Sequence, residues 1–153
     1  MANPEDTLVL ETSKGNVVVE MRPDLAPKHV ARIKELARQG FYDGTPFHRV
    51  IEGFMAQTGD PTGTGTGGSG QNLAAEFSAE PHKRGVVSMA RAQSPDSADS
   101  QFFICLDDAG FLDRKYTVWG RVTEGMENVD QINRGEPPAR PDKIVSAKIA
   151  ADA

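Results

Sequence analysis

The sequence predicts a mainly β protein, an antiparallel barrel or sandwich with two helices, and three observations support this fold class. Short apolar and β-branched segments recur along the chain without repeated strand–helix–strand units, which is typical of antiparallel architectures. Helical periodicity occurs in two places, one near each end of the chain, where helices would cover the open ends of a barrel. The 15 glycines and 10 prolines among 153 residues favour a turn-rich fold.

The first third of the chain predicts a hairpin followed by a helix. Thr7–Thr12 and Asn16–Met21 are β-branched and apolar, and the intervening turn residues pair them as a β-hairpin. Apolar residues three or four positions apart then predict an amphipathic helix that runs to Gln39. We expect Asp24 to be its N-cap and His29 to lie on its solvated face.

The rest of the chain predicts short strands and a second helix. Glycine and proline separate apolar segments that we assign as strands, at Phe47–Ile51, Phe54–Thr58, Val86–Met89, Gln101–Cys105 and Thr117–Val122. Apolar residues one helical turn apart predict a helix over about Met126–Asn133, which Pro137 and Pro138 terminate. Ile144–Ile149 is predicted to be the closing strand.

Composition and length limit the classes of function. A formal net charge of −5 argues against a nucleic-acid partner, because neutralising phosphates requires clustered lysine and arginine. No apolar run approaches the ~18 residues of a membrane span, and the start of the chain lacks the pattern of a signal peptide. We therefore expect a cytoplasmic protein with one domain over residues 1–153 and no membrane partner.

A glycine-rich loop at Thr58–Gly70 contains the spacing Gly-x-Gly-x-x-Gly twice. A dinucleotide site needs a helix N-terminus after such a turn, facing the pyrophosphate. The next segment, Gln71–Glu80, has no long apolar helical stripe and stops at Pro81. The sequence favours a flexible loop between strands and leaves nucleotide binding as a second hypothesis.

Metal and nucleophile chemistry have little support in the sequence. The three histidines are scattered, and one cysteine cannot complete the roughly four ligands of a structural metal site. Cys105 follows Phe-Phe-Ile in a predicted strand, which is typical of a buried and inert thiol. We expect no metal and no cofactor.

An arginine in an apolar strand stands out. Arg49 lies among Phe47, Val50 and Ile51, and burying its guanidinium is costly unless its donors find partners. Spacing alone leaves open whether Arg49 reaches solvent from a strand edge or has a function. The residues alone favour a half-buried, hydrogen-bonded role for the neighbouring His48.

Three segments resemble motifs of the cyclophilin family of peptidyl-prolyl isomerases. They are Phe47–Asp60 (FHRVIEGFMAQTGD), Ser88–Ala92 (SMARA) with Ser100–Cys105 (SQFFIC), and Phe111–Arg121 (FLDRKYTVWGR). The segments occur in the family's order, and the resemblance extends from Thr7 to Ile149. The short length and compact loops resemble a bacterial-type, single-domain member.

The resemblance implies a closed eight-stranded antiparallel β-barrel capped by two α-helices, with a groove on its outer face. It also implies an enzyme, a peptidyl-prolyl cis-trans isomerase that rotates X–Pro bonds in peptides and in unfolded or partly folded proteins and so assists folding. The alternative function is a non-catalytic proline-peptide binding or chaperone module with the same groove.

The resemblance further implies roles for individual residues. Arg49 matches the catalytic arginine, and Gln57 matches the glutamine that orients it. The substrate-binding positions are matched by His48, Phe54, Met55, Gly65, Ala90, Arg91, Gln101, Phe103, Phe111, Leu112 and Tyr116. Four of these match the pocket for the proline ring, namely Phe54, Met55, Phe103 and Leu112.

Three positions depart from the animal or drug-sensitive members of the family. Arg91 replaces an asparagine, Tyr116 replaces a histidine, and Phe111 replaces a tryptophan and therefore lacks its N–H donor. We therefore expect cyclosporin to bind with reduced affinity. The other expected partners are proline-containing peptides and client proteins, bound by a monomer.

Overall fold

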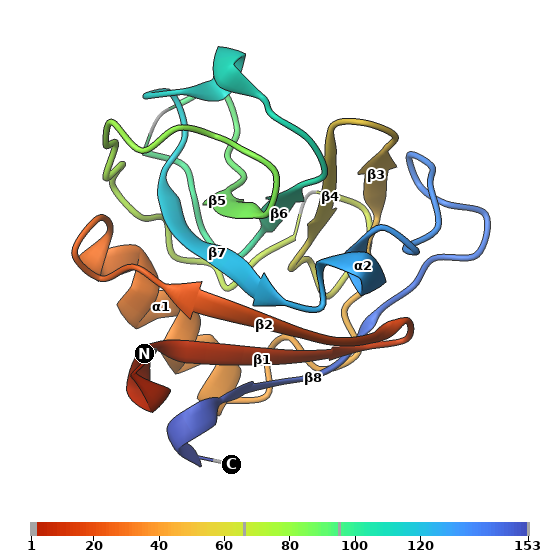
Figure 1. Cartoon of the computed structure of the whole chain (residues 1–153). Helices are drawn as coiled ribbons and strands as arrows, with labels where there is room; N and C mark the ends of the chain where they lie inside the picture. The colour runs from red at the N-terminus through yellow and green to blue at the C-terminus, as the bar shows by residue number, and fades with distance from the viewer. Residues whose placement is uncertain (1–2, 66, 95, 153) are drawn as a thin grey trace.

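A computed structural model describes residues 3–65, 67–94 and 96–152, and eight antiparallel strands dominate it (Figure 1). The strands are β1 (Thr7–Thr12), β2 (Gly15–Met21), β3 (Arg49–Ile51), β4 (Met55–Thr58), β5 (Val86–Met89), β6 (Phe102–Cys105), β7 (Val118–Glu124) and β8 (Ile144–Ile149). They form one sheet in the order β3-β4-β6-β5-β7-β2-β1-β8. Each predicted strand is present, and its bounds agree with the prediction to within two residues.

The sheet is an open half-barrel, so the expected closed barrel is wrong. Strands β3 and β8 stand at its two edges, and no ladder joins them among the described residues. Isolated hydrogen bonds bridge the gap instead, from Gly44 N–H to the Ile144 carbonyl (2.6 Å) and from Phe47 N–H to the Asp142 carbonyl (2.7 Å). Pro46 faces Lys143 between these donors in a non-hydrogen-bonded pair, so its missing N–H leaves no bond of this row unmade.

The two faces of β6 divide the apolar residues into two clusters. Phe102 and Ile104 point into the main core, where the Phe102 ring meets the Trp119 ring edge-to-face at 5.4 Å. Phe103 and Cys105 point the other way, into a smaller cluster with Met55. This second cluster covers the outer face of the sheet and forms the base of the candidate site.

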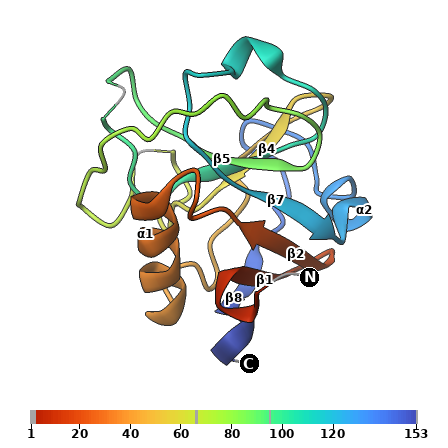
Figure 2. The same cartoon turned by 60° about the vertical axis from the view of Figure 1, so that its left-hand side comes forward.

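The helices lie on opposite sides of the molecule (Figures 1 and 2). Helix α1 (Pro27–Arg38) packs beside β8, and α2 (Met126–Val129) packs beside β2 and is shorter than predicted. The described residues also include three short 3-10 helices, η1 (Pro4–Asp6), η2 (Gly110–Leu112) and η3 (Ala150–Asp152). In the described part of the chain, no helix is both long enough and apolar enough to span a membrane.

The predicted N-cap of α1 is wrong, because the helix begins at Pro27 and Asp24 pairs with Arg22 instead. A carboxylate from a distant loop takes that place. Glu76 accepts hydrogen bonds from the main-chain N–H groups of Lys28 (3.2 Å) and His29 (2.8 Å), and satisfies two helix donors.

His29 is buried rather than solvated, since its side chain is 0% exposed and its Nδ1 lies 2.6 Å from Glu76 Oε1. Burial lowers the pKa of His29 although the Glu76 carboxylate opposes that shift. The main-chain N–H of Glu76 also donates to the Thr117 hydroxyl (3.0 Å), so one loop residue joins α1 to the start of β7.

We expect Glu76→Ala to lower the free energy of unfolding by about 1–3 kcal/mol, because it leaves two helix N–H groups and a buried imidazole without their acceptor. Glu76→Gln keeps an acceptor oxygen and should cost less. Urea denaturation followed by circular dichroism measures both, with the exposed Glu124→Ala as control. A loss no larger than that of the control would contradict the capping role.

Candidate active site

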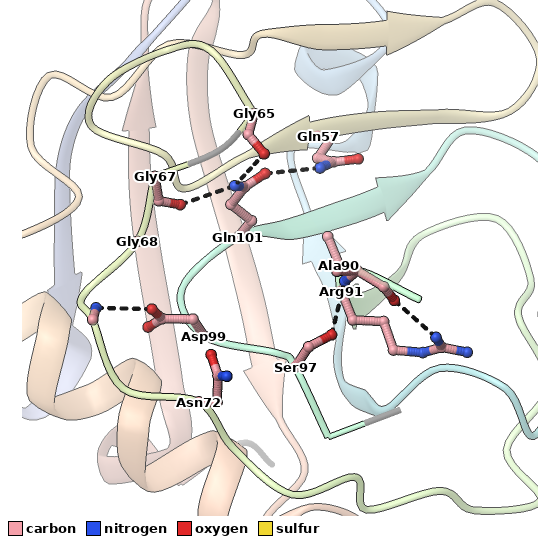
Figure 3. Close-up of a pocket in the computed structure, with 12 residues that line it drawn as sticks. Gln57, Gly65, Gly67, Gly68, Asn72, Ala90, Arg91, Ser97, Asp99 and Gln101 are labelled. Atoms are coloured by element: carbon pink, nitrogen blue, oxygen red, sulfur yellow. Dashed lines mark hydrogen bonds between the residues drawn. The ribbon is translucent and has the colours of Figure 1, made fainter. Parts of the chain in front are cut away.

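Two adjoining cavities lie on the outer face of the half-barrel. The smaller has a volume of about 100 Å³ and is lined by Arg49, Phe54, Met55, Gln57, Ala90, Arg91, Phe103, Leu112 and Tyr116. The larger has a volume of about 490 Å³, and its lining includes Gln57, Gly65, Asn72, Ala90, Arg91, Ser97, Asp99 and Gln101 (Figure 3). Because Gln57, Ala90 and Arg91 line both, the two cavities form one groove.

Strand register brings the charged and apolar parts of the groove together. Arg49 on β3 lies opposite Gln57 on β4, and Gln57 lies opposite Phe103 on β6. Directly opposed residues of antiparallel strands point to the same face of a sheet. The row Arg49–Gln57–Phe103 therefore runs across three strands, and these residues, far apart in the sequence, share the smaller cavity.

Arg49 has an acidic partner that the sequence analysis missed. Its Nε donates to Glu136 Oε1 at 3.0 Å, and both side chains are about half exposed. Main-chain hydrogen bonds of 2.8 Å in both directions between Val50 and Gly135 bring this loop to β3. The sequence carries no local signal for the contact. The guanidinium has five N–H donors. Within the described residues, the four on its two Nη atoms make no hydrogen bond and stay available to a ligand.

The two glutamines are connected to each other. The Gln57 side-chain amide donates to Gln101 Oε1 at 2.9 Å. The side chain that accepts a hydrogen bond from Arg49 is therefore Glu136 and not Gln57. Gln101 in turn donates to the carbonyls of Gly65 (3.0 Å) and Gly67 (2.9 Å). Figure 3 shows this chain of contacts linking β4 to the glycine loop along the edge of the larger cavity.

The apolar wall of the smaller cavity comes from rings on different segments. Phe103 and Tyr116 meet edge-to-face with ring centroids 5.8 Å apart, and Leu112 and Met55 are buried beside them. Phe111 is 66% exposed and packs on Phe54 at 5.4 Å, at the rim of the groove and outside the lining of either cavity.

Behind this wall lies a Ser–His–Asp arrangement that no sequence pattern predicted. The His82 ring stacks on Phe103 at 6.2 Å, with Nδ1 3.1 Å from Asp113 Oδ1 and Nε2 3.0 Å from the Ser88 hydroxyl. Ser88 is 0% exposed, and its hydroxyl donates to the Thr117 carbonyl (2.9 Å). No substrate reaches that oxygen, so the network supports the wall and does not act as a nucleophile.

Asp60 organises the glycine loop from inside. This buried carboxylate accepts hydrogen bonds from the N–H groups of Thr62 (2.8 Å), Gly65 (2.7 Å) and Gly67 (3.0 Å) and from the Thr62 hydroxyl. Burial opposes ionisation, but these donors lower the pKa of Asp60 to about 2. Loop N–H groups bound to a carboxylate cannot cradle a phosphate, and no helix follows in residues 71–85, so the structure gives no support to nucleotide binding.

His48 lies behind the loop rather than in the groove. It is buried, lines neither cavity, and its ring would lie 3.7 Å from a Cβ added at Gly65. Burial lowers the pKa of His48 although Asp60 opposes that shift. Cys105 is buried as expected, and burial raises the pKa of its thiol to about 12. Within the described residues, no cluster of three His, Cys, Asp or Glu could hold a metal ion.

The fold and the groove define a mainly β protein that carries an arginine beside an apolar pocket on the outer face of its sheet. A model of the family described as cyclophilin type peptidyl-prolyl cis-trans isomerase/CLD matches residues 7–149. The chain belongs to this family of isomerases, which confirms the resemblance found in the sequence.

Named relatives agree with the family. A Brucella suis protein called "Probable peptidyl-prolyl cis-trans isomerase" is 52% identical over 168 residues, covering 99% of this chain and 86% of its own length. A Helicobacter pylori peptidyl-prolyl cis-trans isomerase is 46% identical over 131 residues, covering 83% of this chain and 80% of its own length.

Solved structures also agree. The cyclophilin AquaCyp293 from Hirschia baltica matches 99% of this chain and 76% of its own, with a TM-score of 0.92 and 35% identity. A Cryptosporidium parvum cyclophilin type isomerase, crystallised in the presence of the dipeptide Ala-Pro, matches 94% of this chain and 98% of its own, with a TM-score of 0.87 and 30% identity.

We expect Asp60 to give the protein a measurable acid sensitivity. Its folded-state pKa of about 2 is below the ordinary value of 3.8, so its stabilisation is complete above that value and is lost as the pH falls through 3.8 towards 2. The shift corresponds to about 2 kcal/mol.

Asp60→Asn should remove this contribution at neutral pH and leave unfolding less dependent on pH between 5 and 2. The comparison is between denaturation curves of wild type and Asp60→Asn across that range, with the exposed Asp107→Asn as control. If the free energy of unfolding of wild type and of Asp60→Asn changed in parallel with pH, the stability of the loop would not depend on the charge of Asp60.

Proposed function

We propose that this groove isomerises X–Pro bonds, with the proline ring in the smaller cavity and Arg49 as the catalytic residue. The observation that carries the proposal is the row of Arg49, Gln57 and Phe103, which sets a cation beside a ring-sized apolar pocket. The Cryptosporidium parvum relative crystallised in the presence of Ala-Pro supports proline peptides as the ligand class.

The chemistry is a rotation in which no covalent bond is broken. Amide resonance sets a barrier of ~18–20 kcal/mol, and the uncatalysed reaction takes about 10–100 s. In the twisted transition state the proline nitrogen regains its lone pair and accepts a hydrogen bond from an Arg49 Nη–H. The planar ground state offers no such acceptor, so this contact lowers the barrier rather than only binding substrate.

Magnitudes show that Arg49 does not act alone. Millisecond turnover needs about 10⁴–10⁵-fold acceleration, roughly 5.5–7 kcal/mol, whereas one charge-assisted hydrogen bond contributes about 1.5–3 kcal/mol. The remainder comes from holding the substrate in place. Phe54, Met55, Phe103, Leu112 and Tyr116 fix the ring, and Gln57 has one amide N–H left for the substrate backbone.

The proposal extends to the whole chain. Residues 1–153 act as a single isomerase domain and as a monomer in the cytoplasm, on unfolded or partly folded client proteins. The match of the family model over residues 7–149 supports the single domain.

Arg49→Ala should lower kcat/KM by about 10–10²-fold in a protease-coupled proline-peptide assay, the equivalent of one lost charge-assisted hydrogen bond of about 1.5–3 kcal/mol. Arg121→Ala is the matched control, because it removes another exposed arginine paired with a glutamate, Glu20, outside the groove. Near-normal turnover by Arg49→Ala with an unchanged circular dichroism spectrum would overturn its role. Wild-type binding of proline peptides without turnover would establish the binding-module alternative.

Phe111→Trp should tighten inhibition by cyclosporin by about 2–12-fold, the equivalent of one added hydrogen bond at ~0.5–1.5 kcal/mol. Phe111 is exposed at the rim, so the larger ring gains its N–H donor without repacking the core. Inhibition constants from the same assay decide the matter, and equal values for wild type and variant would refute the explanation.

A further inference from the structure

Arg91 lines both cavities, and Figure 3 shows it next to Ala90 at the larger one. It follows β5 by two residues, on the same side of the groove as Ala90. A residue in this position faces any peptide whose proline ring occupies the smaller cavity, together with the residues that continue over the larger one.

The guanidinium of Arg91 is held in one place by the protein itself. Its Nε and Nη2 donate to the Lys115 carbonyl (3.0 and 2.8 Å), and its Nη1 donates to the Ala92 and Gln93 carbonyls (both 3.0 Å). The group also lies 4.6 Å above the Tyr116 ring centroid. Four of five N–H donors are thereby used, and one Nη2 N–H remains for a ligand.

The charge of Arg91 is not matched by an acid. All of its hydrogen-bond acceptors are main-chain carbonyls, and in residues 3–65, 67–94 and 96–152 no carboxylate forms an ion pair with it. The other charged lining residues are compensated. Arg49 pairs with Glu136, and Asp99 accepts hydrogen bonds from Arg32 (3.2 Å), the Ser69 hydroxyl and Gly70 N–H (2.9 Å).

The groove therefore presents a fixed positive charge in a chain whose net charge is −5. We propose that it selects proline substrates with an acidic side chain close to the proline, placed over the larger cavity, and that Arg91 is the specificity-determining residue. This inference rests on the proposed isomerase function.

Geometry and size are consistent with such a ligand. The cavities share Gln57, Ala90 and Arg91, so a peptide with its proline in the smaller cavity continues directly over the larger one. We expect the selected side chain within three residues of the proline, which is about 10 Å of extended chain at about 3.3 Å per residue. A volume of about 490 Å³ admits an aspartate or glutamate with its water. Because the guanidinium is already ordered, pairing with it costs little additional side-chain entropy.

The test is a peptide series in which Asp, Asn or Lys replaces Ala at each of three positions before and two positions after the proline. At one position, wild type should show kcat/KM about 2–5-fold higher for Asp than for its isostere Asn, and lower for Lys. The preference should fall as salt is raised from 0.05 to 0.5 M.

Variants assign the preference to Arg91. Arg91→Gln should bring the Asp-to-Asn ratio to about one, Arg91→Lys should retain part of it because the charge remains, and Arg121→Gln should leave it as in wild type. The wild-type series stands by itself if a variant folds poorly. An Asp-to-Asn ratio of one at every position, or an undiminished ratio in folded Arg91→Gln, would overturn the inference.

Failure of the inference is distinguishable from failure of the proposed function. Wild type that turns over the all-Ala reference peptide without an acid preference retains the function and loses the inference. Wild type that turns over none of the peptides loses both.

Discussion

The antiparallel register between β4 and β6 is the constraint on which the groove depends. It places Gln57 opposite Phe103, and strand alternation then sends Phe102 into the core while Phe103 faces outward. A slip of one residue would exchange the two faces, burying Phe103 and exposing Phe102. The edge-to-face contact of Phe102 with Trp119 and the burial of both rings oppose that slip, so the core fixes the position of the site.

Local patterns predicted the strands, but contacts distant in sequence decided how elements begin and how the sheet ends. β-branched segments between turn residues were sufficient for β1, β5 and β8, whose bounds match the prediction. The cap of α1 comes from Glu76, some fifty residues away, and no spacing rule links that carboxylate to the helix. The gap between the edge strands is bridged by the isolated pair of Pro46 and Lys143, a contact that also appears only once the chain is folded.

Within the site, too, local motifs predicted some residues, and contacts distant in sequence determined the others. Arg49, Gln57 and Phe103 were picked out because their motifs carry them, and the register places the three in one row on the same face of the sheet. Residues that hold parts of the groove in place were missed, because their partners are main-chain groups or distant loops. Asp60 holds the glycine loop, His82 supports the Phe103 ring, and Glu136 meets Arg49. His48, beside Arg49 in sequence, lies outside the lining of both cavities.

Glu136 raises the question of how Arg49, the proposed catalytic residue, can be paired and still donate to a substrate. The side chains of Arg49 and Glu136 are 45% and 57% exposed, and an exposed ion pair contributes about 0–1 kcal/mol. A charge-assisted hydrogen bond to the transition state is worth more, about 1.5–3 kcal/mol. The pair therefore restricts where the guanidinium lies without holding it away from the substrate. Glu136 accepts only from Nε, so in the described part of the chain both Nη groups of Arg49 keep their N–H donors for the proposed contact with the substrate.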